Sequence, residues 1–245
     1  MDNIAELEFP FGAFVPPWDI VAEISSCIDP TSWVLVGGLM VQAHAMMADL
    51  QPRATIDVDV LIDVLADTAN ITHVITSLED LGFKLQESGL RGAPLHRLKR
   101  KDQIIDVLIA EHLPSRKRKS AKVQMLPLME TEGGAQALGR KMKVALKTPE
   151  GQRIFFTPDI LGALVLKAAA YHSDNRNRGR HLDDVALLSS LVDNVAQELS
   201  RLHGSDQKRI RAVAKVLESP NHSAWLTLPD KNQIRGQDVL RILSS

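Results

Sequence analysis

The sequence predicts an α/β (α+β) fold in which a mixed sheet with flanking helices is followed by a C-terminal helical bundle. In the first half, short apolar or alternating stretches typical of strands are interspersed with stretches of helical periodicity. From Pro158 onward the pattern is almost entirely helical. We therefore expect a boundary near 150–157, with an α/β domain over 1–156 and a helical domain over 157–245. The 245 residues suffice for two such domains.

Composition restricts the class of protein. Hydrophobic residues are 44% and charged residues 24%, which excludes a disordered or collagen-like chain. The net charge of −1 argues against a generic polyanion binder, although positive charge gathers locally at 91–101, 116–122, 140–147 and 176–180. The single cysteine, Cys27, excludes an intramolecular disulfide. Without a long apolar run or a signal-peptide pattern, we expect a cytoplasmic protein with no membrane partner.

The expected elements before the boundary follow from their periodicity and from the Gly and Pro residues between them. The helix Trp18–Ile28 precedes the apolar strand Trp33–Val36, and a Gly37-Gly38 turn opens a helix at Leu39–Ala48. We then expect a strand at Ala54–Ile62, a helix near 68–81, strands near 83–87 and 95–99, and a strand at Ile104–Ile109. A turn or short helix over 133–140 and a hairpin of 143–147 with 153–156 complete this part.

The helical part is expected to start at Thr157-Pro158, where a capping hydroxyl precedes a proline at the first helical position. Helices are predicted over about 158–172, 181–201, 205–218 and 236–243.

The most informative segment is Arg53-x-Thr55-x-Asp57-x-Asp59. Residues two apart in a strand share a face, so these polar side chains are expected on one face, with Ile56, Val58 and Val60 towards the core. Adjacent carboxylates repel unless a cation lies between them. Hard oxygen ligands suit Mg²⁺, with Mn²⁺ as the alternative cofactor. An exposed edge strand with two solvated carboxylates is the competing interpretation.

Asp106 interrupts the apolar strand Ile104–Ile109, where an ionised carboxylate needs a partner. If this strand lies beside Ala54–Ile62, Asp106 joins Asp57 and Asp59 in a cluster that two divalent metal ions would neutralise. The alternative for Asp106 is a solvated strand end. Upstream, Gly37-Gly38 would let the backbone approach a phosphate at the start of a helix.

Together, Val36-Gly37-Gly38, the Asp57-x-Asp59 strand and the third carboxylate Asp106 resemble the nucleotidyltransferase superfamily. A later lysine helix followed by an Asp-bearing helix looks more narrowly like the AbiEii-type toxin nucleotidyltransferases of bacteria, over roughly residues 33–192. The resemblance implies a nucleotidyltransferase-like fold. It also implies that Asp57, Asp59 and Asp106 hold metal and that Gly37, Gly38, Arg53 and Thr55 bind the nucleotide. Gly38 replaces the serine that many members carry.

The helix Ile160–Tyr171 is apolar on every side except at Lys167. A lysine buried there needs an anion, unless its stem carries the charge to the surface. By resemblance, Lys167 contacts the nucleotide phosphates. At 100° per residue, Asp184 falls on the apolar side of the next helix and Asp183 does not, so Asp184 is assigned as the family's late catalytic aspartate, orienting Lys167 or the attacking group.

Between these helices, the loop with Arg176, Arg178 and Arg180 is either a solvated turn or a phosphate-binding loop, and Arg178 and Arg180 are assigned to the nucleotide. His172, His181 and the other histidines show no spacing typical of a metal site and are expected at the surface.

The expected function is transfer of a nucleoside monophosphate from an NTP to an acceptor, with release of pyrophosphate. The helical domain would complete the active site. The toxin resemblance implies a tRNA 3′ end as acceptor and an antitoxin protein as partner. The alternatives are transfer to a protein or to a small molecule such as an aminoglycoside, or a non-catalytic nucleotide-binding module.

Overall fold

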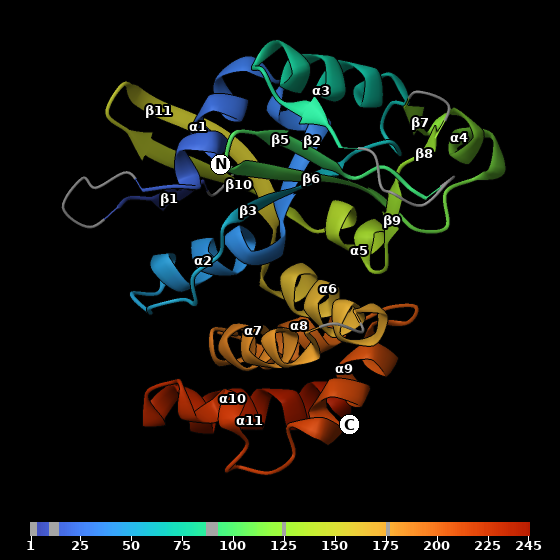
Figure 1. Ribbon diagram of the computed structural model, residues 1–245. Helices are drawn as coiled ribbons and strands as arrows, with labels where there is room; N and C mark the ends of the chain where they lie inside the picture. The colour runs from blue at the N-terminus through green and yellow to red at the C-terminus, as the bar shows by residue number, and fades with distance from the viewer. Residues whose placement is uncertain (1–3, 10–14, 87–92, 124–125, 175–176) are drawn as a thin grey trace.

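The computed structural model describes residues 4–9, 15–86, 93–123, 126–174 and 177–245, and it confirms the predicted α/β class (Figure 1). The strands lie in the first two thirds of the chain, and helices make up the rest. In Figure 1 the sheets and their helices form one half of the molecule and α6 to α11 form the other.

The central sheet has the order β2-β3-β6-β5-β4, and β9 also pairs with β6. Its strands are β2 (Trp33–Val36), β3 (Asp57–Ile62), β4 (Lys84–Leu85), β5 (Arg97–Arg100), β6 (Gln103–Ala110) and β9 (Met129–Thr131). The sheet is mixed because β3 and β6 run parallel whereas β2 is antiparallel to β3. The sequence predicted that Asp106 meets Asp57 and Asp59 only if their two strands are neighbours. β3 and β6 are neighbours in this sheet.

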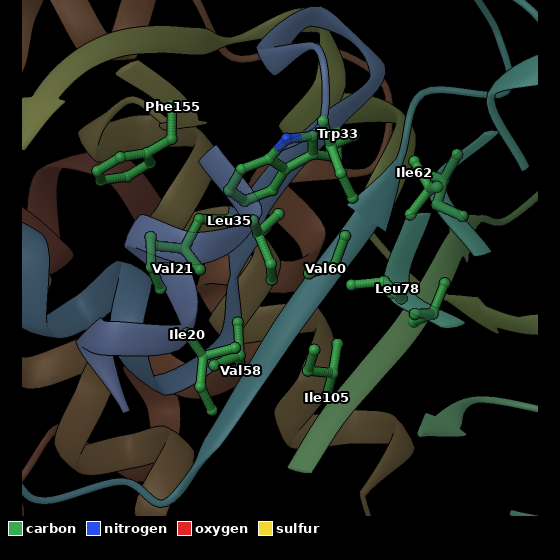
Figure 2. Close-up of a cluster of buried hydrophobic side chains, with 14 of the residues drawn as sticks. Ile20, Val21, Trp33, Leu35, Val58, Val60, Ile62, Leu78, Ile105 and Phe155 are labelled. Carbon is green, nitrogen blue, oxygen red and sulfur yellow. The ribbon is translucent and has the colours of Figure 1, made fainter. Parts of the chain in front are cut away.

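The two faces of this sheet have different neighbours. Val58, Val60 and Ile105 point into a core with the helices α1 (Trp18–Cys27) and α3 (Ala69–Asp80), as Figure 2 shows for Ile20, Val21 and Leu78. The alternate residues Val34, Val36 and Leu61 belong instead to the core that includes α2 (Gly37–Met47) and the C-terminal helices. The carboxylates of β3 and β6 alternate with the first set, so they lie on the face that the C-terminal helices adjoin.

A separate sheet contains the predicted hairpin, β10 (Lys141–Thr148) and β11 (Gly151–Pro158), with β1 (Ala5–Leu7) parallel to β10. The sequence analysis did not anticipate β1. The remaining elements of this half are η2 (Pro30–Ser32), α4 (Ser115–Ser120), the pair β7 (Lys122–Val123) and β8 (Leu126–Pro127), and α5 (Gly134–Gly139).

The last third of the chain is helical, as predicted. Its helices are α6 (Ile160–Ser173), α7 (Arg178–Ser190), α8 (Val195–Ser200), α9 (Asp206–Val216), α10 (Ser223–Leu226) and α11 (Asp230–Ser244). A buried ion pair ties this part to the sheets, because Arg140 Nη2 lies 2.5 Å from Asp206 Oδ2 and 2.7 Å from the carbonyl oxygen of Arg201. In the part of the chain that the structure describes, no helix is both long and apolar enough to span a membrane.

Several predicted boundaries were wrong. The strand expected from Ala54 begins at Asp57, and Ile56 is 76% exposed instead of buried. The segment ahead of it is held irregular because Gln42 Nε2 donates to the carbonyl of Arg53 at 3.0 Å. The helix expected over 181–201 is two helices, since Asn194 caps α8 by accepting from Gln197 N–H.

The start of α6 was also misplaced. Thr157 and Pro158 complete β11, and the expected domain boundary therefore falls within a strand. The Thr157 hydroxyl donates to the carbonyl of Leu35 at 2.9 Å, and Asp159 is the N-cap, accepting from Gly162 N–H. The second helix of the chain likewise begins at Gly37 and not at Leu39.

Candidate active site

Strand register brings the three predicted carboxylates to one place. Asp59 on β3 lies directly opposite Asp106 on the parallel strand β6. Asp57 precedes Asp59 by two residues and therefore shares its face. The Thr55 hydroxyl donates to Asp57 Oδ1 at 2.8 Å, which fixes the first carboxylate of the pair. The structure thus assembles Asp57, Asp59 and Asp106 on the face that the C-terminal helices adjoin.

The Gly37-Gly38 turn is packed against this cluster. Gly37 has a φ of +70°, and a Cβ built there would lie 1.7 Å from Asp59 Oδ2. A Cβ on Gly38 would lie 2.6 Å from Thr55 Oγ1. The backbone N–H of Gly38 hydrogen-bonds to Asp59. The glycines are therefore required first of all by the close approach of the turn to Asp59 and Thr55.

The carboxylates of Asp57 and Asp59 lie close together without a direct cationic contact among the described residues. Burial, and next the neighbouring charge of Asp57, raise the pKa of Asp59 to about 6, although Lys167 acts in the opposite direction. Within the described residues, no ion pair joins either carboxylate to a cationic side chain. Two adjacent carboxylates in this state fit a divalent cation, which would remove the repulsion.

Asp106 is neutralised differently. Arg97 lies opposite it on the antiparallel strand β5, and its guanidinium makes a two-pronged contact. Nε donates to Oδ1 at 2.8 Å and Nη2 donates to Oδ2 at 2.7 Å. The hydrogen bonds to Asp106 raise the pKa of Arg97, so the guanidinium stays charged. Among the described residues, no three Asp, Glu, His or Cys side chains are arranged to hold a metal ion.

A second polar cluster joins α6, α7 and the segment that precedes β3. Lys167 Nζ is 2.8 Å from Asp184 Oδ2, and both side chains are at least 95% buried. Arg53 donates to the same carboxylate through Nε at 2.9 Å and Nη2 at 3.2 Å. Burial alone would raise the pKa of Asp184, but Lys167 and Arg53 outweigh it and lower the pKa. Lys167 therefore has an anionic partner and does not extend to the surface.

The choice of Asp184 over Asp183 agrees with this geometry, because Asp184 is buried and Asp183 is only half-buried. Arg53, assigned from the sequence to the nucleotide, lines the cleft and has two of its donors on Asp184.

Both clusters open into one cleft of about 1410 Å³ between the central sheet and the helical half. Nine predicted residues line it: Gly37, Gly38, Arg53, Thr55, Asp57, Asp59, Asp106, Lys167 and Arg180. Arg178 is not among the lining residues; its guanidinium lies over the Tyr171 ring and Nε donates to the Asp174 carbonyl. Arg176 falls outside the described residues.

The cleft also contains residues that the sequence analysis missed. Glu111 accepts from the backbone N–H groups of Gly133 and Gly134 and lies 3.2 Å from Arg209 Nη2. Arg97 is the most consequential omission. The two residues 101–102 between β5 and β6 fix a hairpin register in which position 97 meets position 106, so the hairpin pattern was a usable signal.

His181 corrects the expectation of a surface histidine. It is 5% exposed and lines the cleft, with Nε2 3.1 Å from Asp174 Oδ2. Burial and the charge of Lys167 lower its pKa to about 4. The ring is therefore neutral at pH 7 and donates from Nε2, while the buried Nδ1 has no partner among the described residues.

This environment predicts a pH-dependent contribution to stability. The folded state binds the His181 proton less tightly than the unfolded chain does, so the contribution is complete above pH 6.5 and is lost as pH falls towards 4. Between pH 7.5 and 4, the unfolding free energy of the wild type should fall by roughly 3 kcal/mol more than that of His181→Gln. Urea denaturation at each pH measures the difference. His73→Gln, at an exposed position of α3, is the matched control and should follow the wild type.

Comparisons with known proteins complete the description. No protein-family model matches the chain, and neither does any curated protein. Among solved structures, the chain is similar to an antigenic nucleotidyltransferase-like protein from Paracoccidioides brasiliensis, with 15% sequence identity and a TM-score of 0.48. The match covers 84% of this chain and 89% of that one.

Proposed function

We propose that this protein is a metal-dependent nucleotidyltransferase that moves a nucleoside monophosphate from an NTP to an acceptor hydroxyl. The observation that carries the proposal is the packing of the Gly37-Gly38 turn against Asp59, whose carboxylate and that of Asp57 have no ion pair among the described residues, in one cleft with the buried Lys167. An exposed edge strand would need neither the glycine turn nor a carboxylate buried against it. Transfer of this type depends mainly on positioning and electrostatics, which is what such a site offers.

The proposed roles follow from the donors present. Asp57 and Asp59 would hold Mg²⁺, or Mn²⁺, which would offset phosphate charge and lower the pKa of a coordinated hydroxyl. Lys167 lines the cleft, where Asp184 at 2.8 Å holds its ammonium group in place, and it would supply a positive charge for the triphosphate. Arg180 lines the cleft at an exposed position; its Nη2 pairs with Asp174 at 3.0 Å, and its remaining donors would serve a phosphate at the mouth. Asp184 contacts no part of the cleft surface and acts by positioning Lys167.

The acceptor we propose is the 3′ end of tRNA, with the protein acting in the bacterial cytoplasm as the toxin of a toxin–antitoxin or abortive-infection system. This choice rests on the sequence resemblance in the Gly-Gly turn, the Asp57-x-Asp59 strand and the Lys167 helix. The cleft volume supports a second ligand besides the nucleotide, because about 1410 Å³ exceeds the roughly 300–1,000 Å³ of ordinary single-ligand pockets.

A small cationic acceptor is the second candidate. The sequence alone showed no acidic cluster beyond the metal site, but the structure places Glu130 and Glu132 of the β9 region on the cleft wall. These carboxylates would favour an amine-bearing molecule over an RNA backbone.

The decisive experiment combines the protein, Mg²⁺, each α-labelled NTP in turn and total tRNA. Label should appear in RNA, and Asp59→Asn should reduce the rate at least 10³-fold because it removes a metal ligand. Asp102→Asn, an exposed carboxylate in the β5–β6 turn, is the control and should retain full activity.

Metal-free Asp59→Asn should melt no lower than the wild type, since it relieves the repulsion with Asp57. Transfer by Asp59→Asn at the wild-type rate would refute the proposed centre. Label in an aminoglycoside supplied in place of the tRNA would favour the second candidate, and nucleotide binding without transfer to any acceptor would indicate a non-catalytic module.

A further inference from the structure

Resting on the proposed function, we infer that this site holds one divalent cation and not two, and that the guanidinium of Arg97 takes the place of the second ion. Asp106 would then pair with Arg97 and would not bind a metal ion. The sequence analysis gave Asp106 a metal-binding role shared with Asp57 and Asp59, but the structure supplies this carboxylate with a cation from the chain itself.

The contact between Arg97 and Asp106 has the geometry of a permanent pair. Both carboxylate oxygens accept from the guanidinium, at 2.8 and 2.7 Å, with the two groups on adjacent antiparallel strands. The Asp106 side chain is only 11% exposed. Planar two-pronged contacts of this kind are the most favourable that a carboxylate makes with a side chain, and strand pairing holds both backbones in place.

Asp57 and Asp59, in contrast to Asp106, accept hydrogen bonds from neutral groups. Asp57 accepts from the hydroxyl of Thr55 and Asp59 from the backbone N–H of Gly38, and both donors are neutral. Within the described residues, neither carboxylate has an ion pair. The need for an external cation is therefore confined to these two groups.

Charge balance agrees with a single ion. The carboxylates of Asp57, Asp59 and Asp106 together with the guanidinium of Arg97 leave two negative charges, which one divalent ion neutralises. A second ion would give these four groups a net positive charge before the phosphates of a nucleotide bind. Arg97 also lines the cleft, so its guanidinium adds positive charge on the same side as Asp57 and Asp59.

The test counts bound ions. Metal-free protein is titrated with Mn²⁺, and free Mn²⁺ is measured by electron paramagnetic resonance. The wild type should bind one ion, and Arg97→Gln should bind a second. Arg100→Gln is the matched control on the same strand, because that guanidinium pairs with Glu23 away from the cleft; it should still bind one ion.

A charge-neutral double variant, Arg97→Gln with Asp106→Asn, tests the role of Asp106 directly. Its first ion should bind within threefold of the wild-type affinity, whereas a tenfold loss would make Asp106 a ligand and overturn the inference. Two ions in the wild type, or one in a folded Arg97→Gln, would also overturn it while leaving the proposed function intact. No bound ion in the wild type would refute the metal centre itself.

Discussion

Replacing Asp184 with alanine should destabilise the protein by about 3–5 kcal/mol. The reason is that Asp184 is the shared anion of Lys167 and Arg53, and Lys167 is at least 95% buried. Removing the carboxylate leaves that ammonium without a counter-charge in an apolar helix. Urea denaturation at pH 7 measures the loss.

Asp183→Ala is the matched control, one residue away on the same helix. Burial and the charge of Asp184 raise the pKa of Asp183, so its ionised form is disfavoured where it lies. Its removal should therefore change the unfolding free energy by less than about 1 kcal/mol. Equal effects of the two substitutions would show that the Lys167–Asp184–Arg53 cluster contributes nothing specific.

Gly37→Ala should reduce nucleotidyl transfer by about 100-fold or more. The added methyl group would lie 1.7 Å from Asp59 Oδ2 and 2.7 Å from its Cβ, so the side chain of Asp59 cannot stay where it is. The Mn²⁺ affinity should fall with the activity, since the displaced carboxylate is half of the proposed ligand pair. Both quantities can be measured on the same preparation.

The control for Gly37→Ala should be a glycine that also has a positive φ but whose added Cβ would contact no other residue. Gly204 has a φ of +58°, and a Cβ built there meets no atom within 4 Å. Gly204→Ala should therefore lose only about 1–2 kcal/mol of stability, with unchanged activity and Mn²⁺ affinity. If Gly37→Ala likewise loses only stability and keeps its activity and Mn²⁺ affinity, the turn does not position Asp59.

Much of the candidate site could be predicted because its residues violate local patterns. Asp106 interrupts an apolar strand and Lys167 interrupts an apolar helix, and such charges need partners. Helical periodicity placed Asp184 on the apolar side of α7, where it meets Lys167. The strand-rich first half and the helical last third followed from the change in periodicity alone.

What could not be predicted depends on contacts between distant segments. Arg53 was expected to continue the carboxylate strand, but its backbone carbonyl is held by Gln42 and its guanidinium by Asp184. Alternation cannot show such tertiary contacts, and Ile56, expected in the core, is exposed ahead of β3. His181 is buried by the packing of α7 near Lys167 and not by any feature of its neighbours in sequence.

The pair of Arg53 and Asp184 joins residues that are 131 positions apart. At about 5–20 residues per second, a ribosome needs on the order of ten seconds to add that stretch. During this interval the carboxylate strand has been made, whereas the aspartate that orders Arg53 and Lys167 has not. A nascent chain that lacks α7 therefore cannot form the Lys167–Asp184–Arg53 cluster, which is completed only when α7 packs beside α6.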